Sequence, residues 1–283
     1  MKKIITILLL PAFVAAHAQP KLLTQAIITT KTIVVAPEAD ENTPGNPAGP
    51  DGQEIRIMRF GGDGETKTTT WLKNELVKTF SESEMGRTTI IRDNSKKLTT
   101  TIMEMMGRKT GFYATDEDQE MMRRRMDSMM RGRDPNGNRI DRTPPATNIV
   151  YVDESKKIAG YDCKKALIIS TRATGKADTT TVWYCPGFKL QGLSSVGGNL
   201  AGFGSFSPQS GLNGMKNLNG FPMQFQTTMS RGRTITVQVT KLVIDKDIAD
   251  KEFEIPKDIE IKAMKDMQNG GPGSGTIQLR MGQ

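Results

Sequence analysis

Short runs rich in threonine, isoleucine and valine recur along this chain, and they restrict its fold more than any other feature. The runs cover Leu22–Val35, Thr66–Phe80, Arg87–Arg92, Lys97–Met106 and Lys109–Tyr113. Their β-branched residues favour extended backbone, and short polar turns separate several of them. Because consecutive strands joined by short turns pair in antiparallel fashion, the chain is predicted to be mainly β, with an antiparallel sheet at its centre.

A β-hairpin is predicted between the two cysteines. Residues 158–172 and 179–185 resemble strands, and a turn around Gly175 joins them. If Cys163 faces Cys185 across the hairpin, a loop of about five residues remains, which is a common length. Directly opposed residues lie close enough for a disulfide, so a Cys163–Cys185 bond is predicted. A catalytic cysteine pair is the alternative interpretation.

A charged helix with a methionine face is predicted to begin at Thr115. Thr115 and Asp118 have the spacing of a capping box, acidic residues fill the first turns, and Gly132 ends the pattern. One face carries the candidate ligand-binding residues Met122, Met126, Met129 and Met130. This face could pack on the sheet, line a groove for an apolar ligand or partner, or bind copper through its thioethers.

The first 18 residues have the composition of a secretory signal peptide. Two lysines precede an apolar stretch, and Ala16-His17-Ala18 supplies the small residues that a signal peptidase requires, so cleavage is expected between Ala18 and Gln19. The stretch is shorter than the roughly 20 apolar residues of a membrane-spanning helix. The chain is therefore predicted to be exported to the periplasm without a transmembrane anchor.

Several classes of function are disfavoured by composition. The single histidine, His17, leaves with the signal peptide, so the exported chain has no imidazole for a Ser-His-Asp triad or a zinc site. Its net charge falls from +8 to +6 when the two signal lysines are removed, and it has no stacking motif for nucleic acid. We therefore expect a protein that is not an enzyme, with no metal, no cofactor and no nucleic-acid partner.

A single domain is predicted over residues 19–267. Two irregular segments interrupt it: a Pro/Gly-rich insertion at 36–53 and a Gly-rich loop at 187–220. Residues 268–283 are rich in glycine and are expected to form a disordered tail.

The segment IAGYDCKKA at residues 158–166, followed by a strand and by Val182-Trp183-Tyr184, resembles the core motif of domain-of-unknown-function family 4412. Residues 218–223 and 253–256 are similar to later parts of that family's pattern. The family consists of exported Gram-negative proteins and is grouped with the LolA-like lipoprotein-carrier superfamily. Cys185 and the insertion at 36–53 depart from the family pattern.

This resemblance implies a curved antiparallel sheet, an open half-barrel, with a covering helix. In lipoprotein carriers of that shape, an apolar concavity holds acyl chains. The hypothesis for this chain is thus a non-enzymatic periplasmic binding protein that holds a lipid or an acyl chain. The alternative is a structural or protein-interaction envelope protein with a filled core. The resemblance leaves the oligomeric state open.

Overall fold

The computed structural model describes residues 19–35, 64–84, 86–131, 146–171, 175, 177–191, 212–228, 232–244 and 246–268. The predicted signal peptide at 1–18 and the insertion at 36–53 lie outside these residues. Residues 269–283 of the predicted tail also lie outside the described residues.

The described residues form a mainly β fold, as predicted. The strands are β1 (Lys21–Leu23), β2 (Gln25–Val35), β3 (Gly64–Lys73), β4 (Leu76–Ser83), β5 (Gly86–Asp93), β6 (Leu98–Met105), β7 (Arg108–Thr115), β8 (Ala146–Ile158), β9 (Tyr161–Thr171), β10 (Ala177–Cys185), β11 (Phe188–Leu190), β12 (Phe221–Thr228), β13 (Thr234–Val243) and β14 (Ile261–Ala263). The helices are α1 (Asp116–Arg131), α2 (Met264–Gln268) and the 3-10 helices η2 (Leu212–Asn217) and η4 (Asp250–Phe253).

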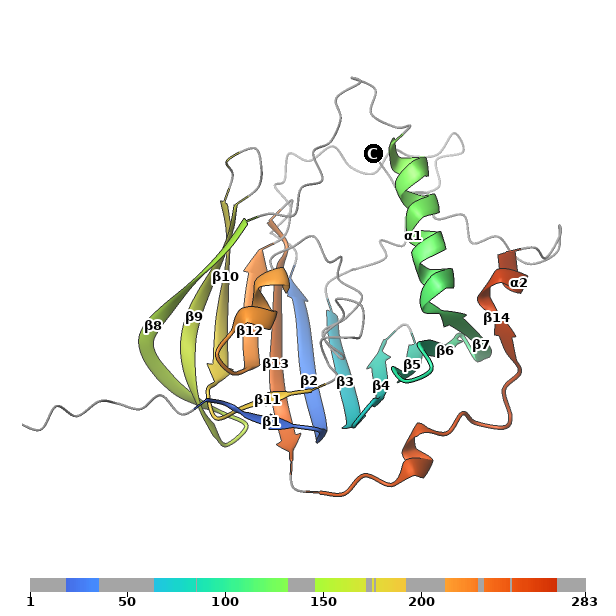
Figure 1. Ribbon diagram of the computed structural model, residues 1–283, viewed down its shortest axis with the longest axis horizontal. Coiled ribbons are helices and arrows are strands. Elements are labelled where there is room, and N and C mark those ends of the chain that lie inside the picture. Colours follow the sequence, from blue (N-terminus) through green and yellow to red (C-terminus); the bar gives the residue numbers. More distant parts are fainter. Residues whose placement is uncertain are drawn as a thin grey trace, which may run out of the picture.

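Twelve of the described strands form one curved sheet in the order β14-β7-β6-β5-β4-β3-β2-β13-β12-β10-β9-β8. Every neighbouring pair is antiparallel except β14 with β7, which confirms the predicted sheet type. Strands β1 and β11 form a separate parallel pair, and α1 stands at the β7 end of the sheet (Figure 1). None of the described helices combines the length and the apolar character needed to cross a bilayer.

The prediction of one continuous strand over Thr66–Phe80 is wrong, because the chain turns back within this range. Strands β3 and β4 pair with each other, and Lys73 opposite Leu76 closes a tight turn. Asn74 has a φ of 51°, a left-handed conformation that asparagine tolerates better than most residues. The run therefore contains a hairpin whose two halves share the same β-branched composition.

Strand β8 was not predicted from the sequence. It precedes β9 and joins it through Ala159 and Gly160, which have φ values of 49° and 86°. The hairpin of β9 and β10 follows the predicted register, with Lys165 opposite Trp183 and Ile169 opposite Thr179. Figure 1 shows β8 as the outermost strand on its side of the sheet.

The sheet face covered by η2, here called the η2 face, carries two apolar clusters. One includes Val182, Phe225 and Val237, with Met215 and Leu218 packed over them from η2 and the residues after it. The other joins β2 and β3 to β11 and β12 and includes Phe188 and Phe221. The described ends of the predicted Gly-rich loop at 187–220 thus belong to the core.

A band of buried hydroxyl groups also crosses the η2 face. Thr180 contacts Thr227 at 3.1 Å between their Oγ1 atoms, and Thr68 contacts the Ser81 hydroxyl at 3.0 Å. Thr30 and Thr32 are buried in the same band. Because burying a hydroxyl is unfavourable unless it is hydrogen-bonded, these cross-strand contacts allow a partly polar face to be buried.

Replacing Gly220 by alanine is expected to lower the free energy of unfolding by about 2 kcal/mol. A Cβ at this position would overlap the backbone carbonyl of Cys185 and lie 2.8 Å from Cδ2 of Tyr184, so strand β10 would have to shift. Urea denaturation measures the loss. Gly64→Ala is the matched control, because nothing lies within 4 Å of a Cβ there. Equal effects of the two substitutions would contradict the prediction.

Candidate functional site

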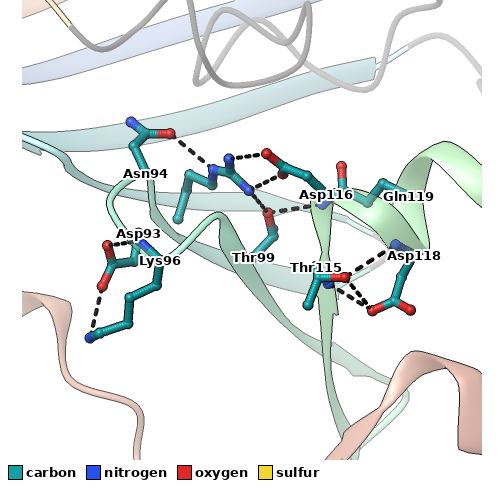
Figure 2. A network of polar contacts seen from close by, with 9 residues as sticks. Asp93, Asn94, Lys96, Thr99, Thr115, Asp116, Asp118 and Gln119 are labelled. Atoms are coloured by element: carbon teal, nitrogen blue, oxygen red, sulfur yellow. Dashed lines mark hydrogen bonds and ion pairs between the residues drawn. The ribbon is translucent and has the colours of Figure 1, made fainter.

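A buried arginine forms an ion pair that attaches the first turn of α1 to the sheet. The guanidinium of Arg92 on β5 donates to both carboxylate oxygens of Asp116, at 2.6 and 3.0 Å. It also donates to Oδ1 of Asn94 at 2.9 Å and to Oγ1 of Thr99 at 3.1 Å (Figure 2). The Arg92 side chain is 8% exposed and that of Asp116 46%. The Arg92 hydrogen bonds and charge hold the pKa of Asp116 below its usual value.

The helix begins as predicted, with a capping box. Oγ1 of Thr115 accepts from the Asp118 backbone N–H at 3.1 Å, and the Asp118 carboxylate accepts from the Thr115 N–H at 2.9 Å. The N–H and hydroxyl of Thr115 lower the pKa of Asp118. Gln119 adds a hydrogen bond to Thr99 at 3.0 Å. Glu120 also forms an ion pair with Arg124, with an N–O distance of 2.9 Å.

The structure describes Met122 from the predicted ligand-binding face, whereas the side chains of Met126, Met129 and Met130 lie outside the described residues. Met122 is 38% exposed, and the neighbouring Met121 is 67% exposed. Thioethers at this level of exposure on a helix fastened through its first turn leave apolar surface available for contact.

The predicted Cys163–Cys185 disulfide is absent, and both residues are free, buried thiols. The pairing that placed them opposite each other is nevertheless correct up to Tyr184 opposite Lys164, one position before the cysteines. Burial and the nearby Cys185 raise the pKa of the Cys163 thiol to about 11, and burial raises that of Cys185 as well. Both thiols are therefore protonated at neutral pH, which argues against the alternative of a catalytic pair.

A lysine that no motif in the sequence points to lies over a tryptophan near these thiols. Nζ of Lys156 is 4.2 Å from the ring centroid of Trp183 and donates to Oε1 of Gln224 at 2.7 Å. Burial lowers the pKa of Lys156. A bulge in β8 after Val152 sets this position by placing Lys156 opposite Cys163. No turn residue in the sequence marks that bulge.

A hollow of about 370 Å³ lies beside β1, away from α1 (Figure 1). Leu22, Leu23 and Ile244 supply apolar lining, and Lys21 and Lys246 are among its charged lining residues. Met122, the one predicted ligand-binding methionine whose side chain the structure describes, is not among the residues that line it. Among the described residues, no group of three or more His, Cys, Asp or Glu side chains is placed to hold a metal ion.

Comparison with known proteins does not identify a family for this chain. No family model matches the sequence, so the resemblance to family 4412 is not confirmed, and no curated protein matches it. Among solved structures, PNGF-II is similar at 12% identity and a TM-score of 0.32, over 84% of this chain and 31% of that chain. The present chain thus spans about a third of PNGF-II.

Two further structures are similar at the same low level. MucB matches at 8% identity and a TM-score of 0.36, over 83% of this chain and 58% of MucB. A putative outer membrane lipoprotein-sorting protein domain from Vibrio parahaemolyticus matches at 9% identity and a TM-score of 0.28, over 81% and 89%. Because all three TM-scores are below 0.5, the function of this chain has to be inferred from its own sheet and helix.

Proposed function

We propose that this chain is an exported, non-enzymatic binding protein that holds an apolar ligand, a lipid or an acyl chain, against the methionine face of α1. The exposure of Met122 on a helix fastened by its first turn carries this proposal. Because a thioether side chain is unbranched and polarizable, it adapts to flexible hydrocarbon chains. The resemblance implied a wholly apolar concavity. The η2 face is partly polar instead, because a band of buried hydroxyl groups crosses it.

The first experiment measures binding of a fluorescent fatty acid to residues 19–283, together with mass spectrometry of lipid that copurifies with the protein. Met122→Asp is expected to weaken fatty-acid binding roughly tenfold or more, because a carboxylate would lose hydration against hydrocarbon. The matched control is Met106→Asp, another exposed methionine, which lies in the turn between β6 and β7. This control is expected to bind like the unmodified protein.

Two results would contradict the proposal. The first is a protein that carries no lipid and takes up none of the fluorescent fatty acid. The second is binding that survives Met122→Asp but is lost on Leu22→Asp, which would assign the ligand to the hollow beside β1 instead of α1. Circular dichroism of each variant shows that the fold is retained.

The second candidate function is that of a structural or protein-interaction envelope protein. The long outer edge of β8 favours it, because backbone groups at the edge of a sheet can pair with another strand. Val150 and Tyr151 on this strand are exposed apolar side chains. Binding through this edge requires no ligand on α1, so the two functions are separable by experiment.

A further inference from the structure

Strand β8 has an unusually long edge without a neighbouring strand in the described part of the chain. It is 13 residues long and pairs with β9 on one side, at the end of the strand order. Edge strands are usually short or are interrupted by charges, prolines or bulges, because a free row of N–H and C=O groups recruits other strands. In β8 such protection is confined to one half of the strand.

The protected half begins at the bulge after Val152. Asp153, Glu154 and Lys157 are exposed there, and the register with β9 shifts between Val152 and Ser155. Both features oppose the addition of a flat strand. The other half, Ala146–Val152, contains no charged residue and keeps an unbroken register with β9.

The uncharged half has a defined length. Pro144 and Pro145 precede it in the sequence, and proline has no N–H to donate to a neighbouring strand. The bulge ends it on the other side. A segment of seven residues, Ala146–Val152, is therefore competent to pair along its free edge.

We propose that two copies of this chain associate through antiparallel pairing of Ala146–Val152 with the same segment of the second copy. A twofold axis at Ile149 gives each copy the same contact, as closed dimers require. In that register Asn148 lies opposite Val150 of the second copy, and Thr147 lies opposite Tyr151. Every opposed pair is uncharged, and the exposed side chains of Val150 and Tyr151 gain cover.

The side chains of Tyr151 and Ile149 are already oriented by contacts within one copy. The Tyr151 hydroxyl accepts from the Asn219 N–H at 3.2 Å, its ring meets that of Tyr184 edge to face at 5.6 Å, and Ile149 packs on the η2-face cluster. The edge is thus held in its strand conformation before the second copy arrives, which reduces the entropy lost on association.

Sedimentation velocity over a range of concentrations is the test, with the full exported chain. The unmodified protein is expected to dimerise. Asn148→Lys combined with Val150→Lys sets two lysine pairs directly opposite each other in the dimer and is expected to raise its dissociation constant on the order of tenfold. Asn148→Lys combined with Val150→Glu is the matched control, because it creates two Lys–Glu pairs in the same register and restores dimerisation.

Amide hydrogen exchange gives a second readout, since protection of residues 146–152 is expected to rise with protein concentration. A protein that stays monomeric at every concentration would overturn the proposal. So would a dimer that the two-lysine variant leaves unchanged, because the contact would then lie elsewhere. Binding of an extended peptide from another protein at this edge, without dimerisation, would likewise overturn it. None of these readouts depends on lipid, so the result is independent of the proposed function.

Discussion

Replacing Asp116 by alanine is expected to lower the free energy of unfolding by about 3 kcal/mol, because it leaves a buried guanidinium without its carboxylate. Arg92 is 8% exposed and donates two hydrogen bonds to Asp116. The value is at the lower end for a buried pair, since the carboxylate side is 46% exposed and partly hydrated. Urea denaturation followed by circular dichroism measures the loss.

Two variants separate this ion pair from other effects. Glu117→Ala is the matched control, because it removes an acid from the same helical turn while leaving the Arg92 contacts intact. It is expected to cost only a few tenths of a kcal/mol, from the helix dipole. Adding Arg92→Met to Asp116→Ala removes the orphaned charge and is expected to recover part of the loss. A loss in Glu117→Ala as large as in Asp116→Ala would contradict the assignment.

The contribution of this ion pair should depend on pH in a defined direction. The pKa of Asp116 is lowered in the folded protein, so the stabilisation is fully present above the unfolded pKa, roughly 3.9. It is lost as the pH falls through the lower folded value. The difference in stability between the unmodified protein and Asp116→Ala should therefore shrink in acid. A difference that stays constant below pH ~4 would rule out the carboxylate as its source.

Cys163 and Cys185 are free thiols in the structure, and oxidation that joins them is expected to stabilise the protein by about 3 kcal/mol. Each thiol loses one proton and one electron, and a disulfide-bearing oxidant is reduced to two thiols as the new S–S bond forms. The register of β9 and β10 runs as far as Tyr184 opposite Lys164, one position before the two cysteines. Since the bond closes a loop within the hairpin, it restricts the unfolded chain.

Burial makes this oxidation depend on folding. With the Cys163 pKa at about 11, the folded, reduced protein exposes little thiolate at neutral pH and should react slowly with oxidised glutathione. Refolding in the same reagent should form the bond readily. Mass spectrometry after alkylation counts the free thiols, and Cys163→Ala is the control whose stability must not respond to reductant. Two alkylated cysteines after oxidative refolding would refute the bond.

The sequence predicted the structural features that depend on nearby residues. Thr115 and Asp118 are three positions apart, so the start of α1 could be derived from capping chemistry alone. The register of β9 with β10 followed from a short loop, because loop length determines which residues face each other. Strands β3 and β4 have the same β-branched composition. The turn between them at Asn74 could not be predicted, because no glycine marks it.

The contact that holds the first turn of α1 against the sheet could not be predicted from the sequence. Arg92 and Asp116 are 24 residues apart, and neither residue carries a local signal for the other. The antiparallel pairing of β5 with β6 and of β6 with β7 brings Arg92 and Asp116 together. The methionine face of α1, by contrast, stays a prediction from helical spacing, which depends on one element only.

Local composition thus determined that this chain makes strands, where its charged helix begins, and which residues of the β9–β10 hairpin face each other. Only the tertiary structure decided the strand order, in which Ile28 of β2 lies opposite Leu242 of β13 at the centre of the sheet. It also left β8 at an edge and placed Lys156 over Trp183. The physical reason is range: propensities, caps and short loops act over a few residues, whereas sheet order depends on the simultaneous burial of side chains from distant strands.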